Sequence, residues 1–160
     1  LPAAPPPGGT VTVSNANNGA SGSIEVRSAS GSPTGADRPE FVVVTVGAQS
    51  VSIPAGGTTP QATVITQVAA LGIAAGLTPA SIAVGASIAS VGIGTPLQTV
   101  QLMAAIQGLT NASDLTNLST GIATFNQIVS TLPQSQLENA MMNPSFASIA
   151  ATLRAARAAL

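Results

Sequence analysis

Side chains that could carry acid–base or nucleophilic chemistry are scarce in this sequence. The 160-residue chain contains no His, Cys, Lys, Trp or Tyr, and its only charged residues are five acids and four arginines. Enzymes draw most of their acids, bases and nucleophiles from His, Cys, Lys, Tyr, Asp and Glu. A Ser-His-Asp triad, a Cys-His pair and a Ser-Lys dyad are all impossible here. Only carboxylate chemistry remains open to this chain.

The closest pair of acids that could act together is Asp37 and Glu40, in a loop bounded by prolines. Two carboxylates could serve as the acid and the base of a glycosidase. The Trp and Tyr side chains that would stack on sugar rings are absent, however, and Arg27 and Arg38 are available as ion-pair partners. We therefore interpret this segment as a solvated loop. We predict no catalytic residue and expect that the protein is not an enzyme.

Metal, cofactor and nucleic-acid binding are disfavoured on similar grounds. Zinc sites are built from His and Cys, and calcium loops cluster several acids at Asp-x-Asp spacing; neither pattern occurs. The glycines of Gly92-Ile93-Gly94 follow an expected helix rather than a strand, so they do not match a phosphate-binding fingerprint. Four arginines balanced by five acids supply no basic surface for nucleic acid. We predict no metal, no cofactor, no nucleic-acid partner and no small-molecule substrate.

The composition favours self-association. Charged residues make up 6% of the chain and hydrophobic residues 45%, whereas a soluble domain carries about 25% charge. Residues 41–113 contain no charge at all. A surface with so little charge resists association poorly, so we expect much of it to be buried by neighbouring copies. A soluble monomer with an uncharged Ser/Thr/Gln surface remains the alternative.

The N-terminal third is expected to form a small sheet. Residues 1–9 are Pro-rich and predict an extended arm, and residues 10–57 predict a β region. Residues 10–14 and 23–27 alternate apolar and polar side chains, with Asn18-Gly19 between them as a hairpin signal. In the second of these strands, apolar and charged side chains take opposite faces, with Ile24 and Val26 on one and Glu25 and Arg27 on the other.

Two further strands follow a loop at residues 28–39. Phe41–Val46 is a β-branched run that predicts a strand buried on both faces, and Gln49–Ile53 alternates again. Residues 10–53 therefore predict three or four antiparallel strands. With the helices expected beyond Pro54, the fold class is α+β.

Residues 58–160 predict a bundle of five or six short helices. Three of them open on Thr-Pro, in which Thr caps the free N–H groups and Pro suits the first helical position, and glycines close them. The openings are Thr59-Pro60, Thr78-Pro79 and Thr95-Pro96, and the closing glycines are Gly76, Gly92 or Gly94, and Gly108.

Three more helices are expected towards the C-terminus. One runs from Ser113-Asp114 to about Ser130, a short one from Pro133 to near Met142, and the last from Asn143-Pro144 to Leu160. Apolar residues at helical spacing mark the buried stripes of two of them. These stripes are Leu115, Leu118, Ile122, Phe125 and Val129 in the first, and Phe146, Ile149, Leu153 and Leu160 in the last.

A membrane protein that uses residues 60–108 is the main alternative. The segment is uncharged and rich in small and apolar residues. A membrane-spanning helix needs about 20 consecutive apolar residues, and Thr78-Pro79 interrupts the segment before that length is reached. It lacks flanking Lys/Arg clusters and an aromatic belt. A third interpretation is an adhesion or ligand-binding module with an apolar pocket between its helices.

We interpret the chain as the non-catalytic subunit of an extracellular homopolymer, such as a filament, sheath or surface layer. The sequence begins Leu-Pro-Ala-Ala-Pro, which suits a mature N-terminus after signal-peptide removal and predicts a secreted or cell-surface protein. An arm of residues 1–14 could complete the sheet of a neighbour by strand addition. The candidate assembly residues are Val11, Val13, Ile24, Val26, Phe41, Val42, Val43, Val44, Val46, Arg154 and Arg157.

Overall fold

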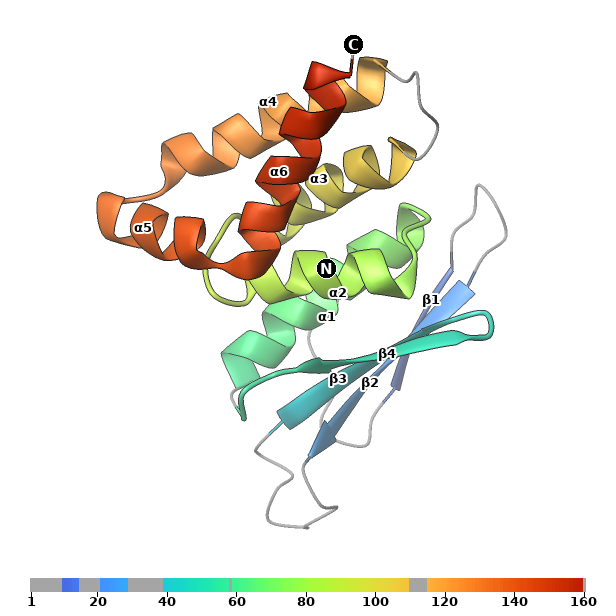
Figure 1. Ribbon diagram of the computed structural model, residues 1–160. Helices are drawn as coiled ribbons and strands as arrows, with labels where there is room; N and C mark the ends of the chain where they lie inside the picture. Colours follow the sequence, from blue (N-terminus) through green and yellow to red (C-terminus); the bar gives the residue numbers. More distant parts are fainter. Residues whose placement is uncertain (1–9, 15–20, 29–38, 58, 110–114, 160) are drawn as a thin grey trace.

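The fold was analysed in a computed structural model that describes residues 10–14, 21–28, 39–57, 59–109 and 115–159. The described N-terminal residues form a four-stranded antiparallel sheet in the order β1-β2-β3-β4 (Figure 1). Six described helices follow, so the α+β class is as predicted. The strands are β1 (Thr10–Ser14), β2 (Ser21–Ser28), β3 (Pro39–Val46) and β4 (Gln49–Pro54). The helices are α1 (Thr59–Ala74), α2 (Pro79–Ala89), α3 (Pro96–Gly108), α4 (Leu115–Thr131), α5 (Gln134–Met142) and α6 (Pro144–Ala158).

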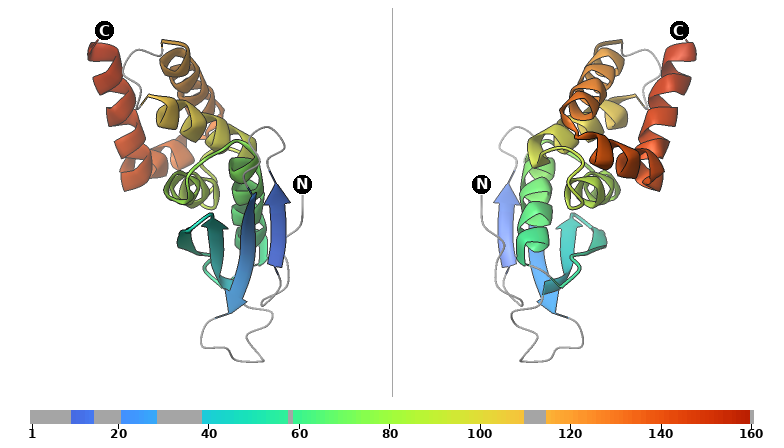
Figure 2. Two further views of the ribbon diagram at one scale, coloured as in Figure 1. Left: turned by 90° about the vertical axis from the view of Figure 1, so that its right-hand side faces the viewer. Right: turned by 90° about the vertical axis from the view of Figure 1, so that its left-hand side faces the viewer.

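The sheet buries one of its two faces. In β2, Ile24 and Val26 are fully buried while Arg27 is exposed, as the alternation in the sequence predicts. The prediction that β3 is buried on both faces is wrong. Val42 and Val44 are buried, but the Phe41 side chain is 41% exposed. The reason is that the helices lie against only one side of the sheet (Figure 2).

Two helices cover the buried face and join the sheet and the helices in one hydrophobic core. α1 packs on β1, β2 and β3, and α2 packs mainly on β4. The two helices approach each other closely because Gly72 of α1 has no side chain. A Cβ atom there would lie 2.7 Å from Cγ1 of Ile82 on α2. Small residues therefore set the helix spacing in this core.

Side-chain caps fix where the helices begin. The Thr78 hydroxyl accepts a hydrogen bond from the backbone N–H of Ser81 at 3.2 Å. At α3, Thr95 and Gln98 form a reciprocal capping box. At α6, Oδ1 of Asn143 accepts from the N–H of Phe146 at 3.1 Å. The helix starts predicted at Thr78-Pro79, Thr95-Pro96 and Asn143-Pro144 are confirmed.

Glycines end the first two helices as expected. Gly76, Gly92 and Gly94 all take positive φ angles, which glycine adopts without steric cost. Gly108 differs, because it is the last residue inside α3 and Leu109 is the cap. Asn18-Gly19 lies outside the described residues, as do residues 1–9, the acid Asp37 and the predicted start of a helix at Ser113-Asp114.

The buried stripe of α4 differs from the predicted one. Its buried residues are Leu118, Gly121, Thr124 and Ile128, whereas Leu115 is 60% exposed. A Cβ at Gly121 would lie 3.0 Å from Cδ2 of Leu153 on α6, so this glycine admits its neighbour at close range. A stripe drawn only through large apolar residues overlooks such a contact. In α6, Phe146, Ile149 and Leu153 are buried as predicted, and Leu160 lies outside the described residues.

The helices predicted as a possible membrane segment pack within this core. In the described part of the chain, none of the helices combines the length and the apolar character needed to cross a membrane.

Candidate functional site

The two edges of the sheet carry unusually little protection against strand addition. β1 and β4 are the outer strands, and no other strand of the described residues pairs with their free sides. Soluble proteins commonly guard such edges with charged side chains, prolines or bulges. Neither TVTVS of β1 nor QSVSIP of β4 contains a charge, and the one proline, Pro54, is the last residue of β4. Both edges therefore offer backbone N–H and C=O groups without a charged guard.

The sheet also has the strand directions that an open-ended assembly needs. All three pairings, β1 with β2, β2 with β3 and β3 with β4, are antiparallel. The two edge strands therefore run in opposite directions. If β4 of one copy meets β1 of a second copy in the same orientation, the new pair is again antiparallel. Such a head-to-tail contact repeats and builds an extended sheet or filament.

The open face of the sheet is close to neutral. Arg27 donates from Nε to Oε1 of Glu25 at 2.8 Å. This hydrogen bond lowers the pKa of the Glu25 carboxyl and raises that of Arg27, so both groups remain charged and cancel each other. The hydroxyls of Thr45 and Ser50 lie 3.3 Å apart on neighbouring strands. The face can approach another neutral surface without leaving an unpaired charge there.

The predicted assembly residues of the sheet fall into two groups, those buried in the core and those on the open face or the β1 edge. Ile24, Val26, Val42 and Val44 lie in the core beneath the helices of the same chain. They are not part of the surface, because the face they occupy is already covered. Val46 also packs against this core.

The remaining predicted residues of the sheet lie elsewhere. Phe41 pairs with Arg27, and Val43 pairs with Glu25; these two partners are on the open face. Val11 and Val13 occupy positions on the β1 edge strand that pair with Ile24 and Gly22. Arg154 and Arg157 lie on α6, whose main contacts are with the helices α2, α3, α4 and α5.

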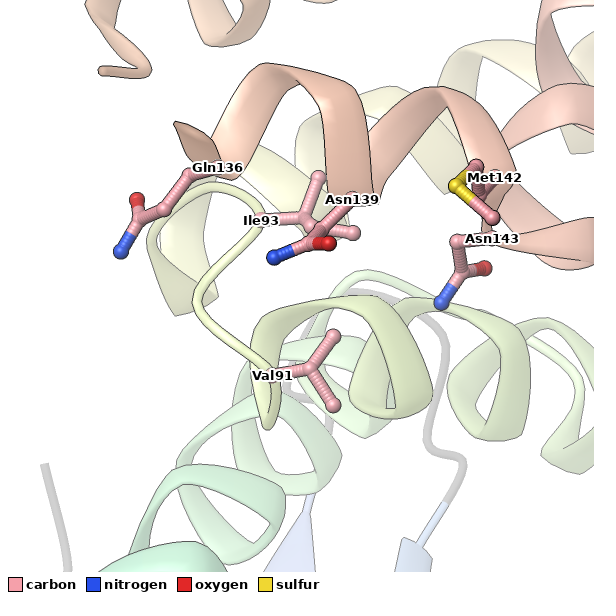
Figure 3. Close-up of a pocket in the computed structure, with 6 residues that line it drawn as sticks. All are labelled: Val91, Ile93, Gln136, Asn139, Met142 and Asn143. Carbon is pink, nitrogen blue, oxygen red and sulfur yellow. The ribbon is translucent and has the colours of Figure 1, made fainter. Parts of the chain in front are cut away.

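A shallow cleft of about 330 Å³ lies between α5 and the loop that joins α2 to α3 (Figure 3). Val91 and Met142 line it and are 56% and 81% exposed. Its polar side chains are the amides of Gln136, Asn139 and Asn143, of which Asn143 also caps α6. The described lining residues include no ionisable group, so acid–base chemistry has no donor or acceptor of protons there.

No protein-family model matches the chain, and neither a curated protein nor a solved structure matches it.

The acids offer no cluster in the described part of the chain. Glu25 is paired with Arg27, and no group of three or more His, Cys, Asp or Glu side chains that could hold a metal ion is found among the described residues. Of the predicted loop pair, Glu40 accepts a hydrogen bond from the N–H of Ala55 through its backbone oxygen at 2.7 Å. Asp37 lies outside the described residues.

Sequence reasoning missed the importance of β4. Its strand was expected, but the sheet order that makes it an edge was not known. The signal was present in the absence of charge from Phe41 to Ser113, because this uncharged stretch includes the whole of β4.

Proposed function

We propose that this protein is a non-catalytic subunit that assembles with copies of itself through the edges of its sheet. The observation that carries the proposal is that both edge strands are uncharged and run in opposite directions. Main-chain hydrogen bonds between β4 and the β1 of the next copy would hold the polymer, as in other cases of strand addition.

The composition supports the same proposal. The chain has 6% charged residues and a net charge of −1, which leaves little electrostatic repulsion between copies. Exposed apolar side chains also occur on both parts of the described molecule, from Phe41 on the sheet to Leu97 and Leu115 on the helices. An uncharged surface with many Ser and Thr residues suits a polymer more than a concentrated soluble monomer. The assembly that we propose is an extracellular filament, sheath or surface layer.

Lysines on the edge strand test the proposal. The variant Ser50→Lys/Ser52→Lys adds two charges to β4, where they should block pairing with another strand. We expect the wild-type protein to form sedimentable polymers that electron microscopy resolves as filaments or sheets. We expect the edge variant to remain as small soluble species in sedimentation velocity.

The matched control is Ser23→Lys/Val43→Lys, which adds the same charge to the same open face on the two central strands. It should polymerise nearly as well as the wild type, because its edges are unchanged. Equal loss of assembly in both variants would show that net charge or the open face matters and not the edge. A wild-type protein that stays monomeric at high concentration would sink the proposed function itself.

A further inference from the structure

Three helices frame an apolar groove in the part of the molecule farthest from the sheet. α4, α5 and α6 form the sides of a triangle (Figure 1), and the groove among them has a volume of about 390 Å³. Its apolar walls include Ile122, Phe125 and Val129 of α4, Met141 of α5 and Leu153 of α6. Ligand pockets in proteins have volumes of about 300–1,000 Å³, so the groove suits one small molecule.

Packing beneath the groove holds its walls in place. The ring of Phe125 stacks on that of Phe146, with centroids 4.7 Å apart and planes inclined by 13°. Phe146 is fully buried, so it anchors Phe125 at the groove surface. Met141 at the rim is 60% exposed, and its flexible thioether can adapt to different apolar shapes. The site thus combines a fixed floor with an adaptable rim.

Two of the four arginines of the chain line this groove. Arg154 and Arg157 lie three residues apart on α6 and so share one face of the helix. Neither forms an ion pair with an acid of the described residues. Arg157 lies in the last turn, where the helix dipole favours a cation. The dipole does not explain Arg154, which lies one turn earlier beside the apolar wall.

We infer that the groove binds a single-chain amphiphile with an anionic head, of which a fatty-acid carboxylate is the simplest kind. The apolar walls would take the tail, and the two guanidinium groups would bind the carboxylate by charge-assisted hydrogen bonds. A folded protein partner would need about 800 Å² of surface on each side, whereas this hollow is the size of a small ligand. A two-fold contact through this groove would bring four guanidinium groups into one interface, and the described residues of the groove lining include no acid to neutralise them.

This site is separate from the sheet edges, so its occupancy does not depend on the proposed assembly. Binding of laurate to the 160-residue chain, measured by isothermal titration calorimetry below the micellar concentration, tests it. We expect one saturable site per chain. Acetate, which has the head without the tail, and dodecyltrimethylammonium, which has the same tail length with a cationic head, should not saturate it.

Variants of the groove assign the binding to these residues. Arg154→Gln/Arg157→Gln should weaken laurate binding at least tenfold, while Arg27→Gln, which removes an arginine of the sheet outside the groove, should leave it unchanged. Ala150→Phe places a large side chain in the groove wall and should abolish binding without changing the circular dichroism spectrum.

Several outcomes would overturn the inference. These are the absence of saturable laurate binding, equal binding of the cationic amphiphile, and an unchanged laurate affinity in the double arginine variant. A change in sedimentation of that variant without a change in laurate affinity would mean that the groove is a contact between copies instead.

Discussion

At the scale of single residues, this protein depends on small side chains at least as much as on large ones. Gly72 brings α1 against Ile82 of α2, and Gly121 brings α4 against Leu153 of α6. Alanine and glycine leave room for neighbouring backbones, and the tightness of such packing makes even one added methylene costly. Aromatic residues make up only 2% of the chain, so close packing between small side chains contributes much of the core.

Replacement of Gly72 tests this account of the core. The side chain in Gly72→Val would begin 2.7 Å from Cγ1 of Ile82 and 3.3 Å from Cδ1 of Leu77. Forcing extra methyl groups into a packed core costs about 1–3 kcal/mol, and we expect a loss of that size in urea denaturation. Ala80→Val, at an exposed position of α2, is the control and should cost less than about 1 kcal/mol through helix propensity alone. Similar losses in both variants would contradict close packing at Gly72.

At the scale of elements, local chemistry predicted much of what the structure shows. Thr-Pro pairs, an Asn-Pro pair and closing glycines marked helix ends because caps and positive φ angles are local requirements, met by neighbouring residues. The alternation of apolar and charged side chains in β2 is also a local pattern, and it correctly predicted the face that carries Ile24 and Val26 as the buried one. Nothing in Phe41–Val46 itself tells whether one face or two will be covered, because that depends on where α1 and α2 pack.

The buried stripe of α4 was predicted incorrectly because it too depends on which elements pack against the helix. Its apolar residues cover more of the helix than α3 can bury, and the contact at Gly121 decides which part faces inward. Ile122, Phe125 and Val129 are only partly buried: they pack against the margin of the core and also line the groove. A ligand-binding pocket between helices was one interpretation of the sequence, but its place and its arginines could be found only once α4 and α6 were brought together.

The capping box of α3 offers a prediction at this scale. Thr95→Ala removes the hydroxyl that accepts from the N–H of Gln98 at 3.2 Å. Loss of a Thr cap typically costs about 1 kcal/mol, and we expect a decrease of that size in the free energy of unfolding. Thr120→Ala, at an exposed position within α4, loses the same atoms without a cap and should change stability little. If Thr95→Ala were as stable as the control, the box would contribute nothing.

At the scale of the whole molecule, the helices and the sheet have different roles in the assembly that we propose. α1 and α2 cover one face of the sheet, so its open face and the edges of β1 and β4 are the parts of the sheet left to meet another copy, and only the edges offer unpaired strands. β1 completes the sheet of its own chain in this structure. An arm of residues 1–14 that completes the sheet of a neighbour would instead require β1 to be exchanged between chains. Such an exchange differs from the edge-to-edge contact that we propose.

The natural absence of cysteine allows these contacts to be trapped directly. β1 and β4 are three strand spacings apart in one sheet, about 14 Å, which is too far for a disulfide within the chain because the Cα atoms must lie within about 7 Å. Any bridge between a cysteine in β1 and one in β4 must therefore join two chains. Thr12→Cys/Ser23→Cys is the control, since those residues are directly paired in one sheet and should close within a single chain.

Oxidative cross-linking of Thr12→Cys combined with Ser50→Cys, or with Ser52→Cys for the alternative register, is the most direct test of edge-to-edge assembly. We predict a ladder of covalent oligomers on a non-reducing gel, while each single-cysteine variant stops at the dimer and the Thr12→Cys/Ser23→Cys control stays monomeric. A ladder from that control would mean that β1 is exchanged between chains. No species beyond the dimer from either edge-to-edge pair would contradict the proposed assembly.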